Sequence, residues 1–70
     1  TSYSFIFADP PYAFTVEEYR VLVATIFSKN ALQKNGLLII EHAEQIDLSA
    51  LAHYRESRNY GGCIFSFFEF

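Results

Sequence analysis

The fold is decided by the stretch YSFIFADPPY at residues 3–12. Its first part, Tyr3 to Ala8, is a short apolar and aromatic run of the kind that forms a buried parallel strand. Asp9, Pro10 and Pro11 follow at once, and the strand is predicted to end before them because proline cannot extend a hydrogen-bonded ladder. In open α/β sheets, ligands bind beyond the carboxyl ends of strands, so the stretch also marks a candidate binding site.

The segment that follows predicts a helix with a well-marked start. Thr15 can cap its first turn, and Glu18 can reach back to complete a capping box. Apolar residues then recur at helical spacing, namely Val16, Tyr19, Leu22, Val23, Ile26 and Phe27. We expect the helix to fade between Leu32 and Lys34, with Gly36 as its stop.

A second apolar run, Leu37 to Glu41, predicts another buried strand. Strand, helix and strand of these lengths make one right-handed βαβ unit with a parallel sheet. The pattern is weaker between Ala43 and Ala52, where Asp47 is expected to cap a short helix that reaches Leu51.

The tail, His53 to Phe70, predicts two strands joined after Tyr60. Gly61 and Gly62 supply the positive φ values that a tight hairpin turn requires. Beyond the turn, both alternating sets of residues are largely apolar, namely Ile64, Ser66 and Phe68 on one face and Phe65, Phe67 and Glu69 on the other. Such a strand is expected to lie inside the sheet, covered on both faces. The chain is therefore predicted to be α/β, with a βαβ unit followed by an antiparallel β-hairpin in a mixed sheet.

The composition is that of a small folded unit. The chain has 70 residues, of which 51% are hydrophobic and 19% aromatic. This length allows one domain at most, near the size at which a single core is only marginally stabilising. Disorder is excluded, because the chain can bury ample apolar area. We expect residues 1–70 to be a single partial domain that hides apolar surface against other parts of a protein or another chain.

Charge and patterning restrict the function classes. Five Lys and Arg residues face eight Asp and Glu, and the net charge is −3. A protein that binds nucleic acid without help from another chain usually carries a stripe of basic residues. If nucleic acid is the substrate, most of the binding affinity must therefore come from residues outside this chain. No apolar run approaches the roughly 20 residues of a membrane span. The single Cys63 cannot form an internal disulfide, and a cytoplasmic location is expected.

Four stretches of the chain carry a family resemblance. The motif DPPY at residues 9–12 resembles the catalytic motif of amino-group methyltransferases that act on DNA and RNA bases. The stretches GLLIIEH at 36–42, RNYG at 58–61 and FSFF at 65–68 resemble the bacterial 16S ribosomal RNA guanine-N2 methyltransferases.

The resemblance covers essentially the whole chain. It implies the carboxy-terminal half of a doubly wound, Rossmann-like methyltransferase, with the last strand inserted antiparallel beside the second. It also implies S-adenosylmethionine as cofactor, methyl transfer to guanine N2, and ribosomal RNA or the small ribosomal subunit as partner.

The motif has a chemical rationale. The exocyclic amino nitrogen of a base is a poor nucleophile, because its lone pair is delocalised into the ring. Two acceptors, the Asp9 carboxylate and the Pro10 carbonyl, can hold its two N–H bonds and aim the lone pair at a methyl group. Pro10 and Pro11 fix φ at both positions, so the acceptors are held before the substrate arrives. Tyr12 offers a ring on which an extruded base can stack.

Other features of the family are absent from this chain. We find no Gly-rich turn followed by an acid that could hold the ribose hydroxyls, so only Asp9 is expected to touch the cofactor, at its reacting end. The family places the cofactor-binding features upstream, in an amino-terminal half that is missing here. We therefore expect the isolated chain to be inactive, and to form a homodimer through the edge of its first strand.

Several alternatives stay open at this point. Asp9 and the two prolines can simply be a turn that ends a strand. The motif is shared with adenine-N6 methyltransferases of DNA, and the chain can also be an inactive, dimerising fragment. Glu41, His42 and Glu44 suggest a metal site, but a solvated strand end is favoured and no metal is expected. Glu41 is assigned a supporting role at the rim of the site.

Overall fold

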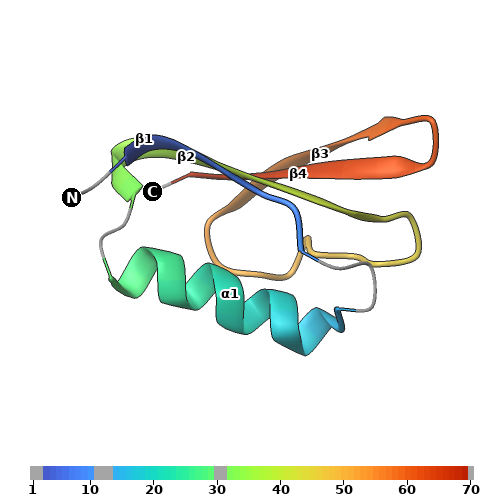
Figure 1. The fold of residues 1–70 in the computed structure, drawn as a ribbon, viewed down its shortest axis with the longest axis horizontal. Helices are drawn as coiled ribbons and strands as arrows, with labels where there is room; N and C mark the ends of the chain where they lie inside the picture. Colours follow the sequence, from blue (N-terminus) through green and yellow to red (C-terminus); the bar gives the residue numbers. More distant parts are fainter. Residues whose placement is uncertain (1–2, 11–13, 30–31, 70) are drawn as a thin grey trace.

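The structure is a computed structural model that describes residues 3–10, 14–29 and 32–69. It contains five elements: β1 (Tyr3–Ala8), α1 (Val16–Ser28), β2 (Leu32–Ala43), β3 (Tyr54–Tyr60) and β4 (Cys63–Glu69). The strands form one sheet in the order β1-β2-β4-β3, and α1 lies along one face of it (Figure 1). The strand β1 runs parallel to β2, and β4 lies antiparallel between β2 and β3. The predicted α/β class and the insertion of the last strand beside the second are both confirmed.

The start of α1 follows the prediction. The Thr15 hydroxyl accepts a hydrogen bond from the Glu18 amide at 3.2 Å, and the Glu18 carboxylate accepts one from the Thr15 amide at 2.8 Å. The capping box is therefore complete, and it satisfies backbone donors that the first turn would otherwise leave unpaired.

The predicted end of the helix is wrong. The helix α1 ends at Ser28, with Lys29 as its cap, and β2 begins at Leu32 instead of Leu37. Pairing with β1 draws these residues into the sheet: Leu32 lies opposite Tyr3, and β2 then advances five residues to Leu37 while β1 advances two. Gly36, expected as the helix stop, lies buried within this irregular part of β2.

The helix predicted from Asp47 to Leu51 is also absent. This segment consists of turns, and the Asp47 carboxylate accepts a hydrogen bond from the Ser49 amide at 2.9 Å. The segment is held instead by Leu48, which is only 1% exposed and packs into the core. Burial of one large apolar side chain and local side-chain hydrogen bonds thus replace the expected helix.

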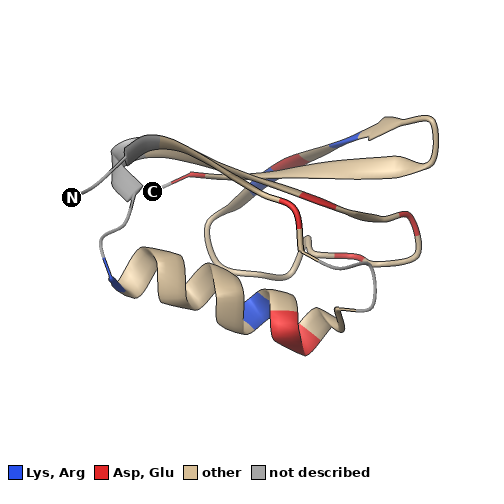
Figure 2. Ribbon diagram, viewed as in Figure 1, with Lys and Arg blue, Asp and Glu red and all other residues tan. Residues whose placement is uncertain are grey.

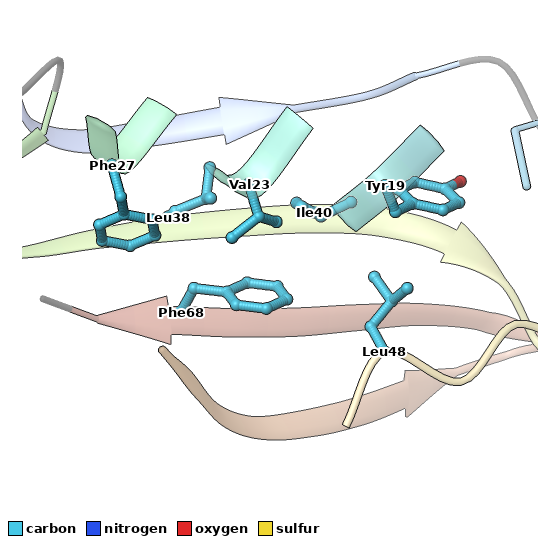
Figure 3. Packing of buried hydrophobic residues seen from close by; sticks show 7 residues of the cluster. All are labelled: Tyr19, Val23, Phe27, Leu38, Ile40, Leu48 and Phe68. Carbon is cyan, nitrogen blue, oxygen red and sulfur yellow. The ribbon is translucent and has the colours of Figure 1, made fainter. Parts of the chain in front are cut away.

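The core lies between α1 and the sheet. Figure 3 shows three side chains of α1 above residues from two strands and the loop, namely Tyr19, Val23, Phe27, Leu38, Ile40, Phe68 and Leu48. Val16, predicted to lie in the apolar stripe, is instead 43% exposed. It precedes the part of the helix that faces the sheet.

The hairpin turn is confirmed, and the expected covering of the last strand is not. Gly61 and Gly62 have φ values of 61° and 90°, a left-handed conformation that glycine adopts more readily than other residues. The opposite sheet face has no covering layer among the described residues, because α1 lies on the other side. On this open face, Phe5 is 53% and Phe7 49% exposed. Within the described residues, no helix is long and apolar enough to cross a membrane.

Candidate functional site at the carboxyl ends of β1 and β2

The motif residues leave the sheet at the shared end of two parallel strands. Ala8 lies opposite Ile40 in the β1–β2 ladder, so Asp9 and Glu41 follow at the same level on adjoining strands. The Asp9 side chain is exposed and Pro10 is half-buried. Pro11 and Tyr12 lie outside the described residues. This end of the sheet therefore carries the Asp9 carboxylate and the Pro10 carbonyl, two acceptors that can receive the N–H bonds of a ligand amino group.

Acidic residues surround this edge. Glu41 lies in β2 and Glu44 directly after it, while Glu17 and Glu18 occupy the first turn of α1. Figure 2 shows red segments at the end of β1, along the end of β2 and in the loop after it. Arg20 lies nearby, but its guanidinium is paired with the Glu17 carboxylate. Nothing at this end thus offers a free cation to a phosphate group among the residues that the structure describes.

Tyr19 brings a buried hydroxyl to the same end of the molecule. Its side chain is fully buried, and its ring meets the ring of Phe14 edge-on at 5.2 Å and that of His42 at 5.9 Å. Among the residues that the structure describes, the hydroxyl has no hydrogen-bond partner. A buried polar group without a partner typically costs about 1–3 kcal/mol. Burial raises the pKa of Tyr19, and the carboxylates of Asp9 and Glu18 raise it further.

His42 is the buried end of a hydrogen-bonded chain. Its Nδ1 lies 3.0 Å from the Ala43 carbonyl, which can only accept, so Nδ1 carries the proton. Its Nε2 then accepts from the Ser66 hydroxyl at 2.6 Å. Ser66 is in turn 2.8 Å from Ser57, and Ser57 is 2.7 Å from the Tyr54 hydroxyl. The chain links β2, β4 and β3 and fixes one tautomer of the histidine.

Burial lowers the pKa of His42, although the bond to the Ala43 carbonyl and the charge of Asp47 act in the opposite direction. The ring is therefore neutral at pH 7. The expectation of a solvated strand end holds for Glu44, which is exposed, and is wrong for His42, which is only 1% exposed. Its side chain faces the core because it alternates with Glu41 along β2.

No metal centre is assembled by the described residues, since no three His, Cys, Asp or Glu side chains lie close enough to share an ion. Nor do these residues fit a nucleoside cofactor by themselves. Gly61 and Gly62 form the turn of the β3–β4 hairpin. They are not part of a strand-to-helix turn of the kind that binds a nucleoside cofactor.

A cavity of about 470 Å³ lies elsewhere, between the later part of α1 and residues 50–53. His53 lies at its rim with φ of 70°, stacked on Phe27 at a centroid distance of 4.1 Å. Neither Asp9 nor Glu41 lines this cavity. The site predicted from the sequence is thus an open edge of the sheet and not this cavity.

The roles of Tyr19 and His42 at this edge were not predicted from the sequence. Tyr19 was interpreted only as part of the apolar stripe, and His42 as part of a solvated end. A signal was present for each, because a tyrosine at a core position and a histidine in an alternating buried strand both require polar partners. The partner Ser66 could not be identified, because the register of β2 against β4, and not their pairing alone, brings it to His42.

The chain was compared with known proteins. A family model described as "Conserved hypothetical protein 95" matches residues 1–69. A solved structure described as a "putative methylase" from Haemophilus influenzae superposes with a TM-score of 0.70 at 19% sequence identity. The match covers 93% of this chain and 40% of that one, so the chain spans less than half the length of this neighbour. At this identity, the likeness shows a shared fold. Among curated proteins, none matches the chain.

Proposed function

Because the chain belongs to the Conserved hypothetical protein 95 family, the methyltransferase family that its sequence resembles, we propose that it forms the catalytic-motif part of an enzyme that methylates the exocyclic amino group of a nucleic-acid base. The observation that carries this proposal is the placement of Asp9 and Pro10, the first two residues of the DPPY motif, directly beyond the carboxyl end of β1. Ligands of open α/β sheets bind at such an edge.

The residues of this chain would act by holding the amino group. One N–H bond of the base donates to the Asp9 carboxylate and the other to the Pro10 carbonyl, which directs the nitrogen lone pair away from both acceptors. Tyr12 stacks on the base and keeps it at the edge. Glu41, level with Asp9 on the adjoining strand, supports the rim of the site. This arrangement is positioning and electrostatic preorganisation, and it requires no metal.

The methyl group would come from S-adenosylmethionine, which supplies it as a sulfonium that is open to attack by nitrogen. The described residues do not fit this cofactor alone, so its binding is assigned to other parts of the enzyme. Binding of the nucleic acid is also assigned mostly to other parts of the enzyme. The edge around Asp9 is acidic, and the formal net charge of the chain is −3, so phosphate contacts must come from basic residues elsewhere.

The substrate proposed is guanine N2 in 16S ribosomal RNA, presented as naked RNA or in the small ribosomal subunit. The support is the resemblance of residues 36–42, 58–61 and 65–68 to that methyltransferase subgroup, beyond the motif that adenine-N6 enzymes share. Such an enzyme works in the cytoplasm, where its RNA is made.

The test is a substitution of Asp9 in the complete enzyme. Asp9→Ala should lower turnover by about two to four powers of ten, the loss typical of one preorganised electrostatic group. The assay follows transfer of a labelled methyl group to unmethylated small ribosomal subunits, with the modified base identified by mass spectrometry. Glu44→Ala, an exposed acid after β2, is the matched control and should retain normal turnover. Near-normal turnover of Asp9→Ala, or a product other than N2-methylguanine, would contradict the corresponding part of the proposal.

A further inference from the structure

Two polar groups at the motif edge have no protein partner among the described residues. The first is the Tyr19 hydroxyl, which is buried. The Asp9 side chain, among the residues that the structure describes, forms no hydrogen bond or ion pair either. One group is an unused donor and the other an unused charged acceptor, and buried donors are rarely left unused without a functional reason.

The position of Tyr19 brings it toward this edge. Figure 3 shows its hydroxyl at the end of the core farthest from Phe27, in the direction in which β1 and β2 run. The helix start fixes this placement, because the backbone amide of Tyr19 donates to the Thr15 carbonyl at 3.0 Å. The rings of Phe14 and His42 hold the tyrosine ring edge-on.

Asp9 is the best available acceptor for this hydroxyl. Beside burial, the carboxylates of Asp9 and, to a smaller extent, Glu18 raise the pKa of Tyr19. The Glu18 carboxylate is already occupied, since it accepts from the Thr15 amide at 2.8 Å. The exposed Asp9 carboxylate is free to turn, and no other donor among the described residues holds it.

We propose that Tyr19 is a positioning residue for Asp9: its hydroxyl donates to one oxygen of the Asp9 carboxylate when a substrate amino group engages the other. The inference rests on the proposed function, because it assigns to Tyr19 the orientation of the acid that holds the amino group. Hydrogen bonds to a charged acceptor are stronger and more directional than neutral ones. An exposed carboxylate would thereby be held in one orientation at the moment of methyl transfer.

The experiment uses Tyr19→Phe in the complete enzyme, which removes the hydroxyl and keeps the packed ring. We expect kcat with unmethylated small ribosomal subunits to fall about tenfold to a hundredfold, with the KM for S-adenosylmethionine unchanged. The melting temperature should stay constant or rise, because the hydroxyl has no partner to lose. Tyr54→Phe is the matched control: its hydroxyl bonds to Ser57 at 2.7 Å, so the control should lose stability and keep its turnover.

A double-mutant cycle then separates this role from a general one. In an Asp9→Ala background, Tyr19→Phe should cause no further loss in a single-turnover assay, because the residue acts through Asp9. A full extra loss in that background would overturn the proposal, as would a fall in melting temperature for Tyr19→Phe alone. Turnover within twofold of normal for Tyr19→Phe, beside an inactive Asp9→Ala enzyme, would overturn the role of Tyr19 and leave the proposed function standing. An active Asp9→Ala enzyme would overturn both.

Discussion

His42 shows how a single residue ties the core to the edge of the sheet. Its ring is buried, and each of its nitrogens has one partner, the Ala43 carbonyl and the Ser66 hydroxyl. A second proton on Nε2 would displace the Ser66 hydrogen and place a charge in an apolar environment. The folded core is thus more stable with the His42 ring neutral than with it protonated.

This environment predicts a pH-dependent stability. The folded-state pKa of His42 is lowered from its ordinary value near 6.5, so the unfolded chain binds a proton more tightly than the folded one. The contribution of the neutral His42 ring to the free energy of unfolding is complete above the ordinary pKa. It is lost as the pH falls below that value, by at most about 1.4 kcal/mol per pH unit for one proton. Thermal unfolding between pH 7.5 and 5.5 should show a falling melting temperature.

Variants of the two histidines isolate this effect. His42→Gln should flatten the dependence across that window, because glutamine does not titrate. His53→Asn is the control, since His53 is exposed and has a φ of 70° that asparagine tolerates. The lowered pKa values of Glu17 and Asp47 place their titrations below this window. An unchanged slope in His42→Gln would show that another group is responsible.

At the scale of elements, α1 depends on its first turn. Its last turn carries no basic residue, so the stabilising end interactions are concentrated in the capping box of Thr15 and Glu18. The same turn follows the DPPY motif and carries Tyr19. A weakened cap would therefore loosen both the helix and the edge of the site.

Removal of the cap tests this dependence. Thr15→Ala removes the acceptor for the Glu18 amide and should lower the free energy of unfolding by about 0.5–2 kcal/mol. Thr25→Ala makes the same chemical change at an exposed position within α1, and it should alter stability by less than about 0.5 kcal/mol. Denaturant unfolding of both variants measures the difference. Equal stabilities would mean that the capping box contributes nothing.

At the scale of the whole molecule, the sheet is covered on one face only by the described residues. The open face carries Phe5 and Phe7, and β1 is an edge strand without a charged residue. The other edge, β3, is different, because it carries Arg55, Glu56 and Arg58. Charged side chains on an edge strand disfavour pairing with a strand of another chain. We therefore expect pairing at β1 and not at β3.

We therefore predict that a chain of residues 1–70 forms at least a dimer through β1 and the adjoining apolar face. Light scattering coupled to size exclusion should report about twice the monomer mass at micromolar concentration. Phe7→Lys should shift the chain toward monomer, because it places a charge on this face. Val21→Lys places the same charge on an apolar residue of α1 that is 50% exposed, on the opposite side of the sheet, and it should leave the dimer intact. A folded wild-type monomer would contradict the prediction.

The same chain should bind S-adenosylmethionine negligibly. Of its residues, only Asp9 is expected to meet the reacting end of the cofactor, and Gly61 and Gly62 belong to a hairpin turn and not to a strand-to-helix turn. Calorimetric titration at millimolar cofactor should give no saturable heat, while the complete enzyme in the same titration should bind. A dissociation constant in the low micromolar range for residues 1–70 would show that the binding residues lie within this chain.

The sequence by itself determined the elements whose signals are local. The bounds of β1, the capped start of α1 and the glycine turn between β3 and β4 rest on neighbouring residues, and all three are confirmed. The DPPY motif and its place at a strand end were likewise readable, because proline ends a ladder wherever it stands.

Only the tertiary structure decided the rest. The end of α1 and the early start of β2 follow from pairing with β1, which competes with helix formation for the same backbone groups. Leu48 replaced a predicted helix by packing into the core. The register of β4 against β2 brought Ser66 to the buried ring of His42. Tyr19 reached the edge of the site through the packing of α1 on the sheet. These contacts join residues far apart in the chain, so no local pattern could reveal them.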